Sequence, residues 1–486
     1  MSLRNRRQFL EETMFAALAA GAAAGPMSGL MAAEQAASSS PNGKLGVAVV
    51  GVRGRGVSHI GAYAGRPDTE ILYVCDADRE IGNSRAEEIA KRQGRKPEFV
   101  EDIRKLLEDK RVDIVSIATP NHTHALFAIW SMQAGKDVYV EKPVSHNVSE
   151  GRRVVEVARK YNRICQTGTQ CRSNPGTAEA MKFVQSGKLG AVKVARGLCY
   201  KRRGSIGARG EYPVPSSVNY DLWLGPAPQA VVTRPQFHYD WHWQWAYGNG
   251  DLGNQGIHQM DLARWGLGVN QLCDRVTSYG GRFGYEDAGE TANTQVVVCD
   301  YGDKSLVFEV RGLKTDNYKG AGVGVVFECA DGYVAISSYD RGTAIDKDGK
   351  VVANFAGGGD HFANFLSAVR SRKHTELNAD IEEGHLSSAL CHLGNISYRL
   401  GEKLSPAQLG ERLQQLETAD DVKATLERTI SHLRDNNVDA DKAGIQLGLA
   451  LKLDPKAETF IDHDQANTML TREYRAPFVV PTADKI

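Results

Sequence analysis

The sequence lacks an excess of charge of either sign. Lysine plus arginine and aspartate plus glutamate each number 59, and the sequence pI is about 7.2. This balance gives no reason to expect binding to nucleic acid or to an anionic membrane surface. Internal repeats are also lacking. The 486 residues, of which 42% are hydrophobic, therefore indicate a globular protein large enough for two domains.

The eight cysteines lack the spacing of a disulfide framework or of a zinc site. None forms a C-x-x-C pair, and most lie in strand-like apolar runs, as Cys75 does. His238 and His242 are four residues apart, and His122 and His124 share one loop. Neither pair has a carboxylate or cysteine partner at the spacing that usual zinc motifs require. We therefore expect buried thiols and no metal.

A long hydrophobic run is missing as well, but a short one follows the N-terminus. Residues 5–10 (NRRQFL) precede an alanine-rich apolar segment at 14–24, which is too short and too weakly hydrophobic for a confident membrane span. This pattern is typical of a twin-arginine export signal. We expect residues 1–43 to be signal and linker, the protein to be periplasmic or otherwise exported, and no stable membrane span to remain after processing. The alternative is a cytoplasmic protein with a frayed N-terminus.

A glycine-rich turn follows the first predicted strand. Residues 44–50 (KLGVAVV) form a short apolar run, residues 51–56 (GVRGRG) follow at once, and a helical pattern starts at Val57. Strand, glycine turn and helix are the context of a dinucleotide fingerprint, although Arg53 stands where G-x-G-x-x-G has its middle glycine. An ordinary glycine turn is the alternative. The predicted cofactor-binding residues in this turn are Gly51, Arg53, Gly54, Arg55 and Gly56.

An acidic residue ends the second predicted strand. Asp76 lies 20 residues after Gly56, where a carboxylate accepts hydrogen bonds from the hydroxyls of an adenosine ribose. Such a carboxylate repels a 2′-phosphate, which favours NAD over NADP. Arg79 lies close enough in sequence to keep NADP open.

Two more strand ends carry polar residues. A strand at 112–118 ends in TPNHTH, and a strand at 138–140 ends in Glu141-Lys142-Pro143. Strands and helices alternate throughout, so the first 165 residues predict a doubly wound parallel sheet, which binds ligands at the carboxyl ends of its strands. For Lys142 a plain surface lysine is the alternative. The further residues predicted to contact the cofactor are Thr119, Pro120, Asn121, His124, Glu141 and Lys142.

Together these motifs resemble the Gfo/Idh/MocA family of sugar and cyclitol oxidoreductases. The resemblance covers roughly residues 44–400 and includes two motifs in the second half, GTQ at 168–170 and NQGIHQMD at 254–261. It implies an NAD-binding Rossmann domain at 44–165. It also implies an α/β domain with a large, mostly antiparallel open sheet at 166–402, which often makes the interface of a homo-oligomer, here a dimer or tetramer.

The resemblance also assigns catalytic residues. Lys142 takes the place of the lysine beside the nicotinamide, and His258 matches the usual acid/base histidine, whereas Asn254 replaces the usual aspartate. Oxidation of a secondary alcohol needs a base for the hydroxyl proton, and a histidine with a pKa near neutrality suits that step. Lys142 can stabilise the developing alkoxide, or accept the proton if its pKa is depressed. Asn254 can orient a substrate hydroxyl but cannot act as a base.

An aromatic segment precedes His258. Residues 237–245 hold three of the six tryptophans and two histidines. Aromatic faces with interleaved polar groups suit a sugar, and packing at an interface is an equally good interpretation. The predicted substrate-binding residues are Asn254, Arg172, Trp241, Trp243 and His238.

Beyond residue 402 the resemblance ends. Ser405 and Pro406 start a helix, and apolar periodicity continues the helical pattern to Asp435, so we expect 403–486 to be a helical extension. Its last 50 residues are mixed in character, and we expect them to wrap the body of the protein.

An exported nicotinamide enzyme has no free cofactor pool around it. We therefore expect NAD to be held tightly and the hydride to be returned in place. One alternative is an NAD-dependent glycosidase or lyase that oxidises a sugar transiently and eliminates a group. A sugar- or nucleotide-binding protein without turnover is the other.

Overall fold

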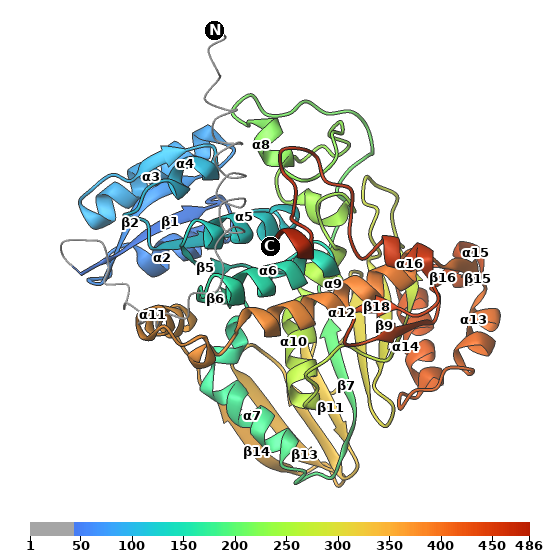
Figure 1. Cartoon of the computed structure of the whole chain (residues 1–486). Helices are drawn as coiled ribbons and strands as arrows, with labels where there is room; N and C mark the ends of the chain where they lie inside the picture. Colours follow the sequence, from blue (N-terminus) through green and yellow to red (C-terminus); the bar gives the residue numbers. More distant parts are fainter. Residues whose placement is uncertain (1–42) are drawn as a thin grey trace. The chain divides into compact units, whose positions relative to one another are not determined.

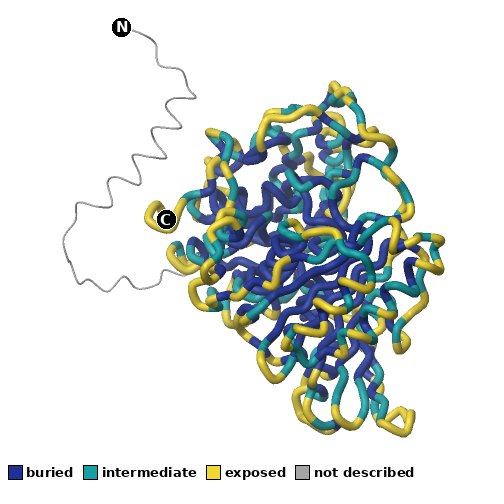
Figure 2. Tube along the Cα trace, turned by 90° about the vertical axis from the view of Figure 1, so that its right-hand side faces the viewer, coloured by how far each residue is buried: buried dark blue, intermediate teal, exposed yellow. Residues whose placement is uncertain are grey.

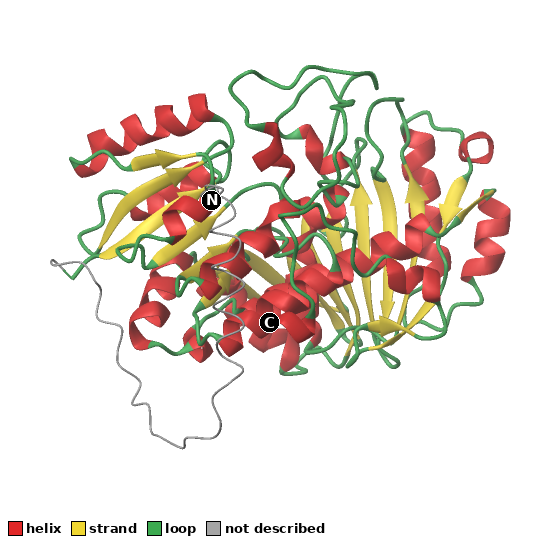
Figure 3. Cartoon of the chain, turned by 45° about the horizontal axis from the view of Figure 1, so that its top comes forward, coloured by secondary structure: helices red, strands yellow, loops and turns green. Residues whose placement is uncertain are grey.

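The computed structural model describes residues 43–486, so the predicted export signal lies outside the described residues. Two sheets organise the chain, and Figure 3 shows their strands as two separate groups. The smaller sheet has six parallel strands in the order β3-β2-β1-β4-β5-β6, which is the doubly wound arrangement. Its strands are β1 (Leu45–Val50), β2 (Thr69–Cys75), β3 (Glu98–Val100), β4 (Ile114–Ile117), β5 (Asp137–Val140) and β6 (Cys165–Thr167).

Helices cover both faces of this sheet. They are α2 (Gly56–Tyr63), α3 (Arg79–Gln93), α4 (Ile103–Leu107), α5 (Asn121–Gln133) and α6 (Val148–Lys160). One more helix reaches it from far along the chain. Phe362, Phe365 and Leu366 of α11 (His361–Ser371) share a core cluster with Val47 of β1, and Figure 1 shows α11 beside this sheet. The sequence pattern gives no hint of this contact.

The larger sheet has twelve strands within the described residues. The order along it is β14-β13-β12-β11-β7-β10-β9-β8-β16-β15, with β17 paired to β8 and β18 to β17. Its pairs are antiparallel except β10 with β7. The predicted fold class, a Rossmann sheet plus a large and mostly antiparallel sheet, is confirmed. The strands are β7 (Val192–Cys199), β8 (Arg275–Gly281), β9 (Thr294–Asp300), β10 (Ser305–Arg311), β11 (Val323–Cys329), β12 (Gly332–Ile336), β13 (Arg341–Asp346), β14 (Val351–Ala356), β15 (Glu402–Leu404), β16 (Ile445–Leu447), β17 (Leu451–Asp454) and β18 (Thr459–Phe460).

Both faces of the larger sheet's centre are buried. Val297 and Phe308 pack with α10 (Gly256–Leu267) and α12 (Ile381–Arg399) on one face, while their neighbours Val296 and Val307 pack under the C-terminal segment on the other. Successive side chains of a strand point to opposite faces, which explains the alternation. Figure 2 shows buried chain in the interior and exposed chain in the outer loops. The remaining helical segments are α7 (Pro175–Gln185), α8 (Tyr220–Leu224), α9 (Gly250–Asn254), η2 (Gln170–Ser173), η3 (Asp240–Trp243), η4 (His374–Glu376) and η5 (Ala483–Lys485).

The C-terminal segment differs from the helical extension that periodicity predicts. Helices α13 (Pro406–Leu413) and α14 (Val422–Asp435) are separate, and α15 (Ala440–Ala443) and α16 (Asp464–Thr468) are short. Strands β15, β16 and β17 extend the larger sheet instead. The predicted helical extension therefore misses these strands, because β16 and β17 pair with β8, more than a hundred residues earlier, and β15 pairs with β16, which local periodicity cannot register.

A buried ion network fixes α14 and the loop before it to the larger sheet. Arg196 of β7 pairs with Glu309 of β10 at 2.9 Å and with Asp420 at 2.6 Å, and Arg428 of α14 pairs with the same Glu309 at 2.6 Å. Burial alone would raise the pKa of Glu309, but Arg196, Arg311 and Arg428 lower it to about 2.

The predicted homo-oligomer stays a prediction. Any contact between copies has to use surface that the C-terminal segment leaves free.

Candidate functional site

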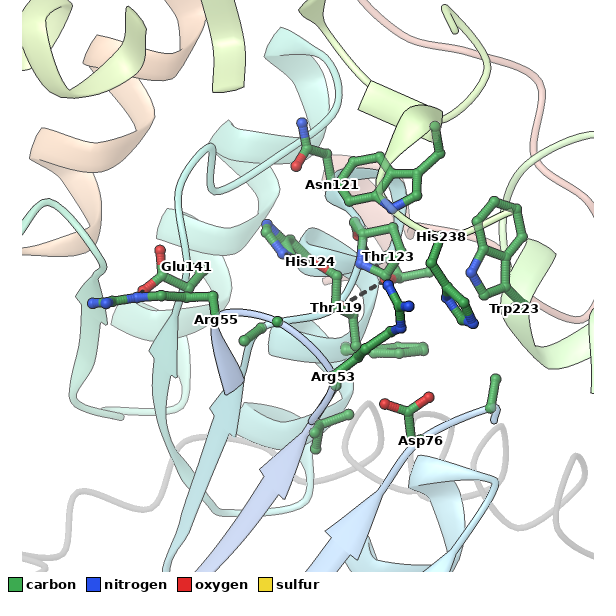
Figure 4. A pocket seen from close by; sticks show the side chains of 18 of the residues that line it. Arg53, Arg55, Asp76, Thr119, Asn121, Thr123, His124, Glu141, Trp223 and His238 are labelled. Atoms are coloured by element: carbon green, nitrogen blue, oxygen red, sulfur yellow. Dashed lines mark hydrogen bonds and ion pairs between the residues drawn. The ribbon is translucent and has the colours of Figure 1, made fainter. Parts of the chain in front are cut away.

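A cavity of about 430 Å³ lies at the carboxyl ends of β1, β2, β4 and β5. Its size falls in the usual range for small-molecule sites, roughly 300–1,000 Å³. Residues from the second half of the chain also line the cavity, among them Asn254, His258 and Tyr339. Figure 4 shows polar side chains from several elements pointing into it. Open α/β sheets bind ligands at this edge, so the cavity is the candidate site.

The glycine turn between β1 and α2 forms one wall. Gly51 has φ +80°, and a Cβ there would lie 2.7 Å from the carbonyl carbon of Ala118. A Cβ on Gly56 would lie 1.9 Å from the Gly51 carbonyl oxygen, whereas one on Gly54 would meet nothing within 4 Å. Positions 51 and 56 therefore accept only glycine, which keeps the turn tight and the start of α2 near the cavity.

Arg53 replaces the middle glycine of the fingerprint and extends into the cavity between Asp76 and His238 (Figure 4). It therefore adds a positive charge where that fingerprint has only backbone.

Asp76 stands at the end of β2, as predicted. Its carboxylate accepts hydrogen bonds from the backbone N–H groups of Val52 (2.8 Å) and Asp78 (3.0 Å). Burial raises the pKa of Asp76 to about 6, although these two amides and Arg53 act in the opposite direction. The Arg79 guanidinium donates to the carbonyl of Ser216 and does not line the cavity.

The cavity beyond Asp76 has an apolar end that the sequence analysis missed. Five large side chains line it: Ile103, Phe127, Leu222, Trp223 and Phe478. They come from α4, α5, α8 and the C-terminal tail, so no local pattern connects them.

Glu141 lies at the floor of the opposite end. Its carboxylate accepts hydrogen bonds from Arg55 Nε (2.8 Å) and Gln170 Nε2 (3.1 Å), and lies 3.2 Å from His59 Nε2. Burial would raise the pKa of Glu141, but His59 and Arg55 hold it well below its usual range. A Cβ on Gly168 would lie 2.7 Å from the Glu141 carboxyl carbon, which explains the glycine of the GTQ motif.

Lys142 and Asn254 meet across the cavity. Lys142 Nζ donates to the backbone carbonyl of Asn254, the last residue of α9, at 2.6 Å. Burial lowers the pKa of Lys142, while the neighbouring Glu141 opposes that shift. The side-chain amide of Asn254 donates to Asp251 at 3.5 Å, and Asp251 itself pairs with Arg203 at 2.7 Å.

His258 sits in the first turn of α10 and is 6% exposed. Its Nδ1 is buried and has no hydrogen-bond partner among residues 43–486, and its ring centroid lies 5.1 Å from that of Tyr339. Burial and the charge of Lys142 bring the pKa of His258 well below the ordinary 6.5, in contrast to the near-neutral pKa expected from its role. The imidazole is therefore neutral and able to accept a proton at neutral pH.

The aromatic segment lines the cavity with only part of its side chains. Trp241 and His242 stack with ring centroids 3.6 Å apart and face the cavity together with His238 and Tyr239. Trp243 is buried outside the cavity, with the Arg203 guanidinium carbon 5.3 Å from its ring centroid. Of the two predicted tryptophans, Trp241 is a candidate substrate contact and Trp243 supports the loop.

Tyr239 is a cavity residue that the sequence analysis missed. It has φ +70°, and the N–H of Asp240 donates to the carbonyl of His238 at 2.9 Å, which makes Tyr239 the centre of a γ-turn. A bulky residue at positive φ is strained, and its side chain is 46% exposed. The loop therefore places this ring at the cavity rather than in the core.

Two predicted site residues have structural partners instead. Arg172 is buried and pairs with Asp261 at 2.8 Å and with Glu383 at 2.9 Å, so the predicted substrate contact is wrong. Its partner Asp261 lies 89 residues away, which sequence reasoning could not see. His124 lines the cavity, but its two ring nitrogens lie 2.7 Å from the carbonyl oxygens of Thr119 and Pro143. It therefore joins two cavity loops.

The other predicted residues line the cavity, except Gly56, which begins α2 beside it. Thr119, Pro120 and Asn121 line it, and the Asn121 side-chain amide donates to Asn249 Oδ1 at 3.1 Å. Over residues 43–486, no group of three or more His, Cys, Asp or Glu side chains is arranged to hold a metal ion. No helix in the same range has the length and apolar character needed to span a membrane.

Comparison with known proteins adds two family matches. Residues 45–169 match the Gfo/Idh/MocA model described as "Oxidoreductase family, NAD-binding Rossmann fold". Residues 178–433 match the model described as "Oxidoreductase family, C-terminal alpha/beta domain". The two matches together span most of the described chain.

Curated relatives include dehydrogenases and a glycosidase. Levoglucosan dehydrogenase of Pseudarthrobacter phenanthrenivorans is 27% identical over 239 residues, 48% of this chain and 54% of its own length. The scyllo-inositol 2-dehydrogenase (NAD(+)) of Bacillus subtilis is 34% identical over 117 residues, 24% and 33% of the two chains. An alpha-N-acetylgalactosaminidase of Shewanella oneidensis is 27% identical over 150 residues, 30% and 33%. The chain thus matches from a third to about half of these relatives' length.

Solved structures share the fold. The WlbA dehydrogenase of Bordetella pertussis, in complex with NADH and UDP-GlcNAcA, has a TM-score of 0.53 and 21% identity, with 71% of this chain and 94% of that chain covered. An oxidoreductase domain protein of Kribbella flavida has a TM-score of 0.55 and 19% identity, with 72% and 96% covered.

Proposed function

The chain belongs to the Gfo/Idh/MocA oxidoreductase family, and from that premise we propose that it oxidises a secondary alcohol of a sugar, glycoside or cyclitol with NAD. One observation carries the proposal. Lys142, at the end of a Rossmann strand, and His258, on a helix of the second sheet, line the same cavity as the glycine turn and Asp76. A nucleotide and an alcohol would thus meet the two proton-handling groups in one place.

The residues present fit a nicotinamide dinucleotide. The glycine turn leaves room for a pyrophosphate at the start of α2, and Asp76 presents a buried carboxylate for a ribose. A buried imidazole nitrogen of His258 has no hydrogen-bond partner in the described part of the chain. When bound, the nicotinamide supplies the acceptor for the hydride of the alcohol C–H.

The chain's own residues then handle the proton and the charge. His258, neutral because of its lowered pKa, takes the hydroxyl proton. The Lys142 ammonium, which lines the same cavity, would stabilise the charge that develops on the alcohol oxygen. Asn254, Trp241 and His238 line the space that a sugar ring would occupy, where they orient hydroxyls and cover its apolar face.

The Asp76 carboxylate favours NAD over NADP. The pH dependence of cofactor affinity tests whether Asp76 is the ribose acceptor. As the pH falls through about 6, the carboxylate gains a proton and becomes a poorer acceptor for ribose hydroxyls. We expect the affinity for NAD to fall about tenfold across that range, the size of a hydrogen bond to a charged group. Calorimetric titration of NAD and NADP over pH measures it, with Asp76→Asn as the variant that removes the pH dependence. A pH-independent Kd in the unaltered protein would exclude Asp76 as the ribose acceptor.

We further propose that the enzyme is exported by the twin-arginine route, retains its NAD and returns the hydride in place. The arginine pair before the apolar segment supports export of a folded protein, which can carry its cofactor with it. Hydride return permits two outcomes, exchange between two sugars or elimination from a transiently oxidised one. The glycosidase among the curated relatives supports the second outcome as the alternative.

The test uses protein purified with its own N-terminus from the exported fraction. We expect nucleotide to be released on denaturation and identified as NAD(H) by mass spectrometry. Mono- and disaccharides and cyclitols are then added one at a time, with nicotinamide absorbance followed in a single turnover and products by mass spectrometry. Protein without nucleotide and with weak NAD binding would overturn retention. Absence of any absorbance change across the panel would overturn the oxidoreductase proposal.

A binding protein without turnover is the remaining alternative. Asn254 in place of the family's aspartate is the observation that favours it. Substitution of Lys142 separates the two, because binding of sugar and nucleotide would persist while cofactor reduction would not.

A further inference from the structure

The C-terminal tail contributes a wall to the cavity. Phe478, eight residues from the chain end, is 1% exposed and lines the apolar end of the cavity. It belongs to the core cluster of the Rossmann sheet, with Ile103 and Phe127, and its ring lies 6.0 Å from that of Trp130 on α5. The family match ends at residue 433, so this wall lies outside it. In Figure 1 the red tail runs back past α8 towards α5.

Hydrogen bonds connect the tail to α8, which also lines the cavity. Arg475 donates through Nε to the carbonyl of Gly225 at 3.1 Å and through Nη2 to that of Asp221 at 2.7 Å. Its guanidinium carbon lies 5.0 Å from the Phe478 ring centroid. Asp221 belongs to α8, the helix that also carries Leu222 and Trp223. The tail and α8 are therefore connected to each other by hydrogen bonds at this end of the cavity.

The chemistry of this end indicates its ligand. Asp76 lines the cavity together with a group of large apolar and aromatic side chains, Ile103, Phe127, Leu222, Trp223 and Phe478. A ribose on Asp76 would place the attached base in this apolar end, where a flat heterocycle packs against aromatic side chains. Glu101 also lines the cavity and disfavours a further phosphate there, whereas Asp102 is paired with Arg104 at 2.7 Å.

We propose that Phe478, together with Leu222 and Trp223, holds the adenine of the dinucleotide, and that the tail thereby slows release of the cofactor. The inference rests on the proposed function and deepens it, because it assigns cofactor retention to residues of this chain. Because Arg475 joins the tail to the end of α8, a movement of α8 away from the tail would break these two hydrogen bonds.

Phe478→Ala tests the proposal, with Val479→Ala as the matched control. Val479 is the next residue, is 46% exposed and does not line the cavity. We expect Phe478→Ala to speed NADH release and weaken ADP-ribose binding about tenfold, the effect of losing one aromatic contact to a base. Nicotinamide mononucleotide, which lacks the adenosine, should bind as before, and Val479→Ala should match the unaltered protein throughout.

Leu222→Ala gives a second variant on the α8 side of the same end, in case Phe478→Ala unfolds the protein. Stopped-flow fluorescence of bound NADH gives the release rate, and calorimetry gives the two fragment affinities. Equal loss of ADP-ribose and mononucleotide binding, or unchanged release in both variants, would overturn the inference. If the unaltered protein binds no dinucleotide at all, the proposed function fails with it. Tight binding that neither variant alters overturns the inference alone.

Discussion

Lys142→Met is expected to reduce the rate of bound-cofactor reduction by about 10²–10³-fold, the usual effect of removing one group that stabilises a developing oxyanion. The Lys142 ammonium donates to the backbone carbonyl of Asn254 and interacts with the charge of Glu141. Lys142 lies just after β5, at the edge of the sheet where the cavity is. Methionine keeps the volume of the stem and removes only the charge and the donors. Single-turnover absorbance of the nicotinamide after sugar addition measures the effect.

Lys201→Met is the matched control. Lys201 is exposed, donates to Gln255 Oε1 at 3.0 Å and does not line the cavity. It should retain the rate of the unaltered protein, and calorimetry should give both variants the same Kd for NAD. Rates within threefold of the unaltered protein for Lys142→Met, which is about 0.7 kcal/mol, would contradict a chemical role for Lys142 and favour the binding protein.

His258→Asn is expected to have an effect of similar size, about 10²–10⁴-fold, because it removes the general base. Asparagine is polar and close in size at the backbone end, but it accepts no proton. The pH profile distinguishes a base from a structural residue. In the unaltered protein the rate should fall on the acid side only well below pH 6.5, because burial and the nearby Lys142 ammonium lower the pKa of His258.

The direction of the pH effect on the rate follows from the lowered pKa of His258. A lowered pKa keeps the imidazole neutral down to a lower pH, so the active form persists further into the acid range. His258→Asn should lose this acid limb and show a low rate that pH changes little. His242→Asn compares a second cavity histidine, whose pKa burial also lowers, to about 3. An acid limb that persists unchanged in His258→Asn would assign the proton to Lys142.

Several site residues were predictable because they follow strands directly. The turn at 51–56, Asp76 and Glu141-Lys142 each come immediately after a β-strand. Parallel strands bring their carboxyl ends to one edge, so a pattern of strands and helices alone places these groups together. His258 was found through the resemblance and not through its spacing.

Other site residues depend on contacts between distant segments. Arg172 was misassigned because its partners Asp261 and Glu383 become neighbours only in the fold. Trp241 and Trp243 look alike in sequence, and the short turn of η3 decides which faces the cavity. Phe478 carries no motif at all.

The sequence by itself determined the parallel sheet, the glycine turn, the acidic residue at the end of β2 and the lysine that follows β5. These features are local, since a strand, a turn and a helix start are each encoded within a few residues. Only the tertiary structure decided what faces them across the cavity. It brought His258 and Tyr339 from the second sheet and Phe478 from the tail, and it set the pKa of His258 through burial beside Lys142. Burial and charge proximity are properties of packed neighbours, so they exist only once the segments from opposite ends of the chain have come together.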